Sequence, residues 1–207
     1  FDILRDKIDR NARYIWFHAA SLGEFEQGRP LIERIRKEHP EYRILQTFFS
    51  PSGYEVRKNY QGADIVCYLP FDTPRNVRRF IEMVNPCMVF FIKYEFWQNY
   101  LNTLYKKGIP VYSVSSIFRP NQIFFRWYGK DYRKVLKTFS HLFVQNEVSE
   151  KLLASIGVTD VTIVGDTRFD RVLDICTVAK DLPLVKAFKG NSKTFVAGSS
   201  WGPDEDI

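Results

Sequence analysis

Segments typical of β-strands alternate with segments typical of α-helices along most of this chain. The strand segments are short and rich in aromatic and β-branched residues, and most connections between segments are short. We expect strands at 14–18, 42–48, 65–69, 88–92, 111–115, 141–145, 161–164 and 194–197. We expect helices at 24–37, 54–60, 74–84, 96–107, 125–139, 148–156 and 170–178, with a weaker helical pattern over 1–13. This alternation predicts an α/β fold with an open, mostly parallel sheet and helices on both faces.

The stretch 14–30 joins the first predicted strand to the first predicted helix. A strand that enters a helix through a tight, Gly-containing turn exposes backbone N–H groups at the helix start. Glu24 stands at that turn. It could be a general base that faces a cleft, or a carboxylate that only stabilises the helix start. The helix N-terminus would lower the pKa of Glu24 and burial would raise it, so both outcomes stay open.

Ligands of open parallel sheets bind beyond the carboxyl ends of the strands. We therefore expect one edge to be shared by the turns at 19–24, 47–53, 69–73, 93–97, 115–121, 145–147 and 165–170. This edge would bring Glu24, Glu95 and Arg168 near one another. Glu95 could instead form a salt bridge with the neighbouring lysine or cap a helix, and Arg168 could pair with Asp166 or Asp170.

Other kinds of site have little support in the sequence. The glycine-rich phosphate motifs GxGxxG and GxxxxGK[ST] are absent, and no metal-ligand pattern links the three histidines. The three cysteines are far apart, which argues against a disulfide scaffold or a zinc site. His18 lies inside a strand and is interpreted as a core histidine with satisfied hydrogen bonds. The turns at 52–53 and 198–200 are candidates for binding an anion or sugar hydroxyls.

The formal net charge of +6 favours an anionic partner, although it also fits a merely soluble basic surface. Aromatic and basic side chains alternate over 117–134, which could be a nucleic-acid surface, a lipid-facing patch or a core helix with a basic outer face. No apolar run approaches the ~18 residues of a membrane span. The chain opens on Phe1 and closes on Ile207, and we expect it to be a fragment of a longer protein.

Five segments occur in a specific order, of which the first, with its His-Ala-x-Ser-x-Gly-Glu pattern, is the most specific. They are Phe17–Phe25, Ser50–Gly53, Tyr94–Trp97, Gln145–Glu147 and Gly165–Asp170. Together they resemble the 3-deoxy-D-manno-octulosonic acid (Kdo) transferases of lipopolysaccharide assembly. The resemblance implies a Rossmann-like sheet that forms the N-terminal, acceptor-binding half of a GT-B glycosyltransferase.

The resemblance also implies roles for individual residues. The family's catalytic base falls on Glu24, its transition-state-stabilising glutamate on Glu95, and its basic stabiliser, usually lysine, on Arg168. Where the family pattern has Glu-Thr-Glu-Leu-Trp-Pro, this chain has Lys93–Gln98, a change that could alter acceptor contacts. Substrate-binding roles are expected for Ser21, Gly23, Ser52, Gly53, Trp97, Asn146, Ser199 and Ser200. No metal and no cofactor are expected.

By this resemblance, residues 14–190 would bind the acceptor and 191–207 would begin a truncated donor domain. Residues 1–13 would be a helical remnant that follows a membrane anchor outside this chain. The implied reaction transfers Kdo from CMP-Kdo to a lipid A precursor, with inversion and without a metal. The expected partners are the lipid A precursor, CMP-Kdo bound through the missing C-terminal domain, and an anionic membrane surface, with no nucleic acid. The expected location is the cytoplasmic face of the inner membrane of a Gram-negative bacterium.

Two other classes of function remain open. The first is a sugar-nucleotide epimerase of the same GT-B architecture. The second is a non-enzymic basic module that binds anionic lipid or nucleic acid through Arg75, Arg78, Arg79 and the stretch 117–134. If the chain is half of a transferase, we expect it to be inactive alone, because most of the nucleotide site would lie beyond Ile207.

Overall fold

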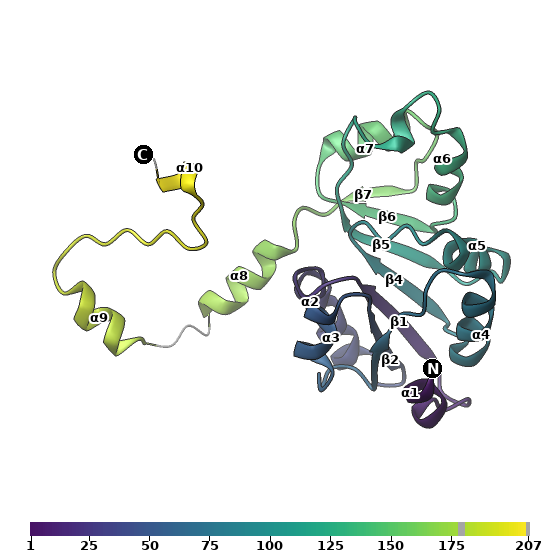
Figure 1. The fold of residues 1–207 in the computed structure, drawn as a ribbon, viewed down its shortest axis with the longest axis horizontal. Helices are drawn as coiled ribbons and strands as arrows, with labels where there is room; N and C mark the ends of the chain where they lie inside the picture. Colours follow the sequence, from purple (N-terminus) through teal and green to yellow (C-terminus); the bar gives the residue numbers. More distant parts are fainter. Residues whose placement is uncertain (178–180, 206–207) are drawn as a thin grey trace. The chain divides into compact units, whose positions relative to one another are not determined.

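A single parallel sheet organises the larger of the two units into which the chain divides (Figure 1). The computed structural model describes residues 1–177 and 181–205, and the units are Phe1–Leu173 and Asp174–Ile207. The sheet has seven strands in the order β3-β2-β1-β4-β5-β6-β7, and every neighbouring pair is parallel. The strands are β1 Tyr14–Ala19, β2 Arg43–Phe48, β3 Ile65–Tyr68, β4 Met88–Ile92, β5 Val111–Ser116, β6 His141–Val144 and β7 Val161–Ile163. The predicted parallel α/β architecture is confirmed.

Helices cover both faces of the sheet. They are α1 Asp2–Lys7, α2 Leu22–Glu38, α3 Pro51–Arg57, α4 Pro74–Val84, α5 Gln98–Lys106, α6 Lys130–Leu136 and α7 Glu147–Ala154, with a 3-10 turn η1 at Ile123–Phe125. A further helix, α8 Arg168–Thr177, begins in the larger unit and ends in the smaller one. Trp16 of β1 packs on one face with Phe80 of α4 and Tyr100 of α5. Its neighbour Phe17 points to the opposite face, where α2 contributes Phe25 to a second cluster. This alternation of successive side chains makes β1 the centre of both cores.

The strand register aligns polar residues near the carboxyl ends of the central strands. His18 of β1 lies opposite Thr47 of β2 on one side and opposite Phe91 of β4 on the other. The winding of the chain reverses between β1 and β4, because β2 and β3 extend the sheet in one direction and β4 to β7 in the other. Such a reversal is where open α/β sheets bind their ligands.

Two predicted elements differ from the structure. The helix expected over 125–139 is reduced to α6, because Gly129 approaches the backbone of η1 so closely that an added Cβ would lie 1.8 Å from the Ile123 carbonyl oxygen. The strand expected over 194–197 is not formed. The described part of the smaller unit has only α9 Pro183–Lys189 and α10 Gly202–Glu205 besides the end of α8, so no partner strand is present there.

Most other boundaries agree with the sequence within a few residues. Thr73 caps α4 by accepting a hydrogen bond from the Asn76 N–H, and Gly108 follows α5 with a φ of +68°. The predicted final residue of α8, at position 178, lies outside the described residues. In the described ranges, none of the helices combines the length and the hydrophobicity needed to cross a bilayer.

Candidate active site

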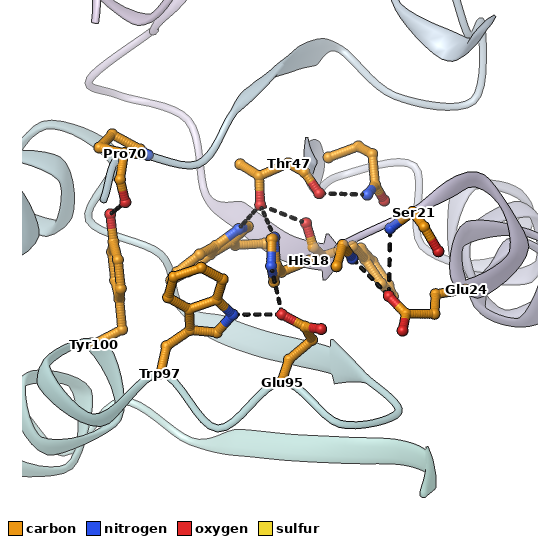
Figure 2. Close-up of polar contacts among 12 residues, drawn as sticks. His18, Ser21, Glu24, Thr47, Pro70, Glu95, Trp97 and Tyr100 are labelled. Carbon is orange, nitrogen blue, oxygen red and sulfur yellow. Dashed lines mark hydrogen bonds and ion pairs between the residues drawn. The ribbon is translucent and has the colours of Figure 1, made fainter. Parts of the chain in front are cut away.

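A buried chain of hydrogen bonds connects the carboxyl ends of β1, β2 and β4 (Figure 2). The Trp16 indole N–H donates to the Thr47 hydroxyl oxygen at 2.8 Å, and His18 Nδ1 lies 2.9 Å from the same oxygen. His18 Nε2 lies 3.0 Å from Oε2 of Glu95, which also accepts a hydrogen bond from the Trp97 indole N–H. The sheet topology therefore brings Glu95 to a histidine that is 77 residues earlier in the sequence.

The position of each proton in this chain of hydrogen bonds decides which groups donate to Glu95. Thr47 accepts from Trp16, so its own proton can go to His18 Nδ1 or to the Phe17 carbonyl oxygen, 3.3 Å away. When that proton goes to His18 Nδ1, the neutral imidazole carries its own proton on Nε2 and donates it to Glu95. Two N–H groups, from His18 and Trp97, then converge on the same carboxylate oxygen of Glu95.

Glu24 lies at the first turn of α2, on the same edge of the sheet. One of its carboxylate oxygens, Oε2, accepts hydrogen bonds from the backbone N–H of Ala20 at 2.8 Å and of Ser21 at 3.3 Å. Burial and the nearby charge of Glu95 raise the pKa of Glu24, and they outweigh the two backbone N–H groups and Lys93, which lower it. The competition that the sequence left open is thus decided in favour of burial. A carboxylate with a raised pKa is better matched to removing a proton near neutral pH.

Lys93, which the sequence marked only as a departure from the family pattern and a possible partner of Glu95, is a site residue. It follows β4 with a left-handed φ of +66°, its N–H donates to the Val114 carbonyl, and its own carbonyl accepts from the Ser116 hydroxyl. Its ammonium group favours the ionised forms of both Glu24 and Asp166. Lys93 therefore supplies positive charge both to the turn after β1, which carries Glu24, and to the turn after β7, which carries Asp166. The sequence feature that could have indicated this role is a lysine placed directly after a buried strand.

Arg168 forms the ion pair that the sequence analysis offered as its alternative role. The guanidinium Nε donates to Asp166 Oδ2 at 2.8 Å, and the Arg168 backbone N–H donates to Oδ1 at 3.0 Å. This pairing, together with Lys93, holds the pKa of Asp166 below its usual value. The structure brings Glu24 and Glu95 close enough to interact. Arg168 reaches the same edge beside Tyr94, with its guanidinium committed to Asp166.

A pocket of about 520 Å³ opens beside Glu95. It is lined by Ala20, Phe49, Asp72, Tyr94, Glu95, Phe96, Trp97 and Gln98. The lining comes from the ends of β1, β2, β3 and β4, as expected for a ligand site at the carboxyl edge of a parallel sheet. Half of the lining residues are aromatic, and Asp72, Glu95 and Gln98 add polar groups, a combination found in small-molecule sites.

Several predicted binding residues have structural tasks of their own. Asn146 caps α7, since its side-chain oxygen accepts from the Ser149 N–H at 2.9 Å. Gly53 is buried against Phe48, and an added Cβ would lie 2.3 Å from that ring. Ser52 is exposed, and its hydroxyl lies 3.0 Å from the hydroxyl of Ser50. None of these contacts occupies the pocket beside Glu95.

The remaining predicted binding residues lie at two helix ends and in the smaller unit. Ser21 is the N-cap of α2, and Gly23 is exposed with no atom within 4 Å of an added Cβ. Trp97 is the N-cap of α5 and lines the pocket. Ser199 and Ser200 are exposed in the smaller unit, so the predictions for them stay predictions. Across residues 1–177 and 181–205, no three His, Cys, Asp or Glu side chains are grouped so that they could hold a metal ion.

Solved structures with the same fold include two UDP-GlcNAc 2-epimerases. The one from Neisseria meningitidis is 15% identical with a TM-score of 0.60, and the match covers 86% of this chain and 53% of that chain. The one from Methanocaldococcus jannaschii is 17% identical with a TM-score of 0.57, covering 87% and 52% respectively. At these identities the likeness shows the fold alone. It agrees with the predicted Rossmann-like half of a GT-B architecture.

Sequence relatives are more specific. Proteins named 3-deoxy-D-manno-octulosonic acid transferase from Haemophilus influenzae and Aquifex aeolicus are 26% and 28% identical to this chain, over 93% and 89% of its length. The chain covers 46% of each of these relatives, so it spans about half of their length. The model of the 3-deoxy-D-manno-octulosonic-acid transferase (kdotransferase) family matches residues 2–171. The ordered motifs, the parallel sheet and this match together show that the chain belongs to the Kdo transferase family.

Proposed function

We propose that this chain is the acceptor-binding half of an inverting, metal-independent transferase that moves Kdo from CMP-Kdo to a lipid A precursor. The observation that carries the proposal is the pair formed by Glu24 and Glu95. Glu24 is a partly buried carboxylate whose pKa is raised, partly by the nearby Glu95, and Glu95 is held by hydrogen-bonding contacts with His18 and Trp97. Family membership and the names of the relatives support this choice of reaction.

In the proposed reaction Glu24 acts as the general base. Its carboxylate takes the proton from a glucosamine hydroxyl of the acceptor, and the resulting oxygen nucleophile attacks the anomeric carbon of Kdo. The bond from that carbon to CMP breaks, and CMP leaves with the bonding electrons. Glu95 and Arg168 adjust the charge around the reacting atoms. General base catalysis of this kind typically contributes about 10²–10⁴-fold to a rate.

The surroundings of the enzyme belong to the same proposal. The acceptor is a phosphorylated lipid, and a chain with a net charge of +6 is suited to an anionic membrane surface. We place the protein at the cytoplasmic face of the inner membrane of a Gram-negative bacterium. In this proposal the acceptor domain spans residues 14–190, which include the larger unit from Tyr14 to Leu173, and the donor domain begins at residue 191 and would complete the CMP-Kdo site with Ser199 and Ser200.

The test is a Kdo transfer assay on the complete protein, including its donor half, with CMP-Kdo and a lipid A precursor. Glu24→Gln should lower turnover by at least about 100-fold, because an amide cannot accept the hydroxyl proton. Acceptor affinity should stay close to that of the wild type. Glu33→Gln is the matched control, since it removes a partly exposed carboxylate from the same helix.

Near-wild-type turnover by Glu24→Gln would refute the assignment of the base. Interconversion of a free nucleotide sugar, with no sugar transferred to lipid, would instead favour an epimerase.

A further inference from the structure

Three aromatic side chains form a row that ends at the pocket beside Glu95. The rings of Phe71 and Phe49 are 5.9 Å apart, and those of Phe49 and Trp97 are 5.1 Å apart, measured between centroids. Phe71 is 70% exposed and Phe49 is 42% exposed. We call these three residues the aromatic track. It is distinct from Phe96, whose ring packs into the core against Phe118 and Phe124.

The exposed rings are carried on a well-fixed backbone. The Phe71 carbonyl accepts hydrogen bonds from the Thr73 N–H at 2.7 Å and from the Asn76 side-chain amide at 3.1 Å. The next residue, Asp72, binds the start of α5, where the N–H groups of Asn99 and Tyr100 donate to its two carboxylate oxygens. Burial in the core does not account for an apolar ring presented to water from so fixed a loop, whereas binding a ligand would.

The geometry of the aromatic track indicates what kind of ligand it fits. Successive rings are inclined at 82° and 58° to one another, so they form a ridged apolar surface and not one flat platform. A sugar ring stacks best on a flat aromatic face, while a flexible hydrocarbon chain can follow ridges. The nearest carboxylate on the Phe71 loop, Asp72, already accepts two backbone hydrogen bonds, so it offers little to a polar ligand.

We propose that the aromatic track binds an acyl chain of the lipid acceptor. This inference rests on the function proposed above. Trp97 connects the two parts of the site, because its ring contacts Phe49 and its indole N–H donates to Glu95. An acyl chain held along Phe71 and Phe49 places the sugar to which it is attached at the Glu95 end of the pocket. The apolar part of the acceptor thereby orients the polar part for reaction.

The test compares two acceptors on the purified 207-residue chain by isothermal titration calorimetry. One is a water-soluble glucosamine disaccharide bisphosphate carrying short acyl chains, and the other is the same disaccharide with the acyl chains removed. Phe71→Ser and Phe49→Ser should each weaken binding of the acylated acceptor on the order of tenfold, since each methylene returned to water changes a binding constant about fourfold. Binding of the deacylated acceptor should not change in Phe71→Ser, because Phe71 lies outside the lining of the pocket beside Glu95.

Tyr105→Ser is the matched control. Tyr105 is an aromatic residue, 63% exposed, in the last turn of α5, whereas Trp97 of the aromatic track lies at the start of that helix. It should leave both affinities as they are. Equal weakening of both acceptors by Phe71→Ser would mean that this ring contacts the sugar, and would overturn the proposal, as would no weakening of either acceptor by either phenylalanine variant. If the wild-type chain binds neither acceptor, the proposed function fails and the inference falls with it. Wild-type binding that the phenylalanine variants leave unchanged overturns the inference alone.

Discussion

At Glu24 two opposing effects act on one carboxylate. The helix start provides two backbone N–H donors, while burial and Glu95 disfavour the charge. The net result is a raised pKa, which means that folding costs free energy whenever Glu24 must be ionised. A group that is held in a state unfavourable to stability is a common sign of a functional site.

This cost predicts how stability depends on pH. Between the ordinary pKa of 4.5 and the raised value, the folded chain keeps a proton at Glu24 that the unfolded chain has lost. The Glu24 contribution to the unfolding free energy therefore falls as pH rises through this window. In Glu24→Gln that decline should be absent, so the variant should gain stability relative to the wild type between pH 4.5 and neutral pH.

Urea denaturation at several pH values checks the difference between the two proteins. Burial raises the pKa of Asp64, but hydrogen bonds from Ile44 and two arginines outweigh it and lower the pKa, so the stability that Asp64 contributes rises with pH. This contribution is the same in the wild type and in Glu24→Gln, and it cancels in their difference. Glu33→Gln again serves as the control. Parallel pH profiles for wild type and Glu24→Gln would contradict the raised pKa.

The His18–Glu95 contact can be tested with two substitutions. His18→Leu removes the N–H donor to a buried carboxylate and should lower the unfolding free energy by roughly 1–3 kcal/mol. His18→Gln retains an N–H donor on a side chain of similar reach and should recover part of that loss. Urea denaturation near pH 7 measures both. If the leucine and glutamine variants are equally stable, the hydrogen bond to Glu95 contributes nothing.

Single residues also show which contacts of the candidate site could be predicted from the sequence. The proximity of Glu24 and Glu95 follows from topology, because both residues come just after strands whose carboxyl ends share an edge. The bond from His18 to Glu95 depends on the direction of a side chain and on strand register, which a sequence pattern does not give. His18 is buried with satisfied hydrogen bonds, as interpreted from its place in a strand, but its partner could not be foreseen.

Among the secondary-structure elements, the starts of α2 and α3 use glycine for different reasons. An alanine Cβ at position 53 would meet the fully buried ring of Phe48 at 2.3 Å, whereas at position 23 it would meet nothing within 4 Å. Gly53→Ala should therefore cost about 1–3 kcal/mol of unfolding free energy through overpacking. Gly23→Ala should be neutral or stabilising by up to about 1 kcal/mol, because alanine favours the helix. Urea denaturation of the two variants would contradict this if Gly53→Ala were harmless.

The stretch 117–134 shows where helical spacing misleads. Phe124 is buried and Trp127 is 90% exposed, so the aromatic residues divide between core and surface. Arg133 stabilises the break by donating from Nε to the Phe124 carbonyl at 2.7 Å. The chain turns back at Gly129 through a contact between backbone atoms, and no pattern of apolar residues records such a contact.

At the scale of the whole molecule, the buried side chains among the described residues lie in the larger unit. Within those residues the buried hydrophobic side chains run from Leu4 to Val158, and the side chains of 181–202 are all exposed. A chain that ends at residue 177 should therefore unfold with a free energy within about 1 kcal/mol of the full 207 residues. Urea denaturation of both chains is the measurement. A loss of more than about 2 kcal/mol would show that the smaller unit contributes to the stability of the larger one.

The reversal of winding at β1 has a consequence for synthesis on the ribosome. The nascent chain delivers β1 and its first neighbour β2 early, but the second neighbour begins only at Met88. At about 5–20 residues per second, one edge of the central strand waits roughly 4–15 s for its partner. Until then the residues that surround Glu24 have no Glu95 beside them, and an apolar strand edge is open to other chains. The emerging polypeptide is therefore most vulnerable to aggregation just before its candidate catalytic centre can form.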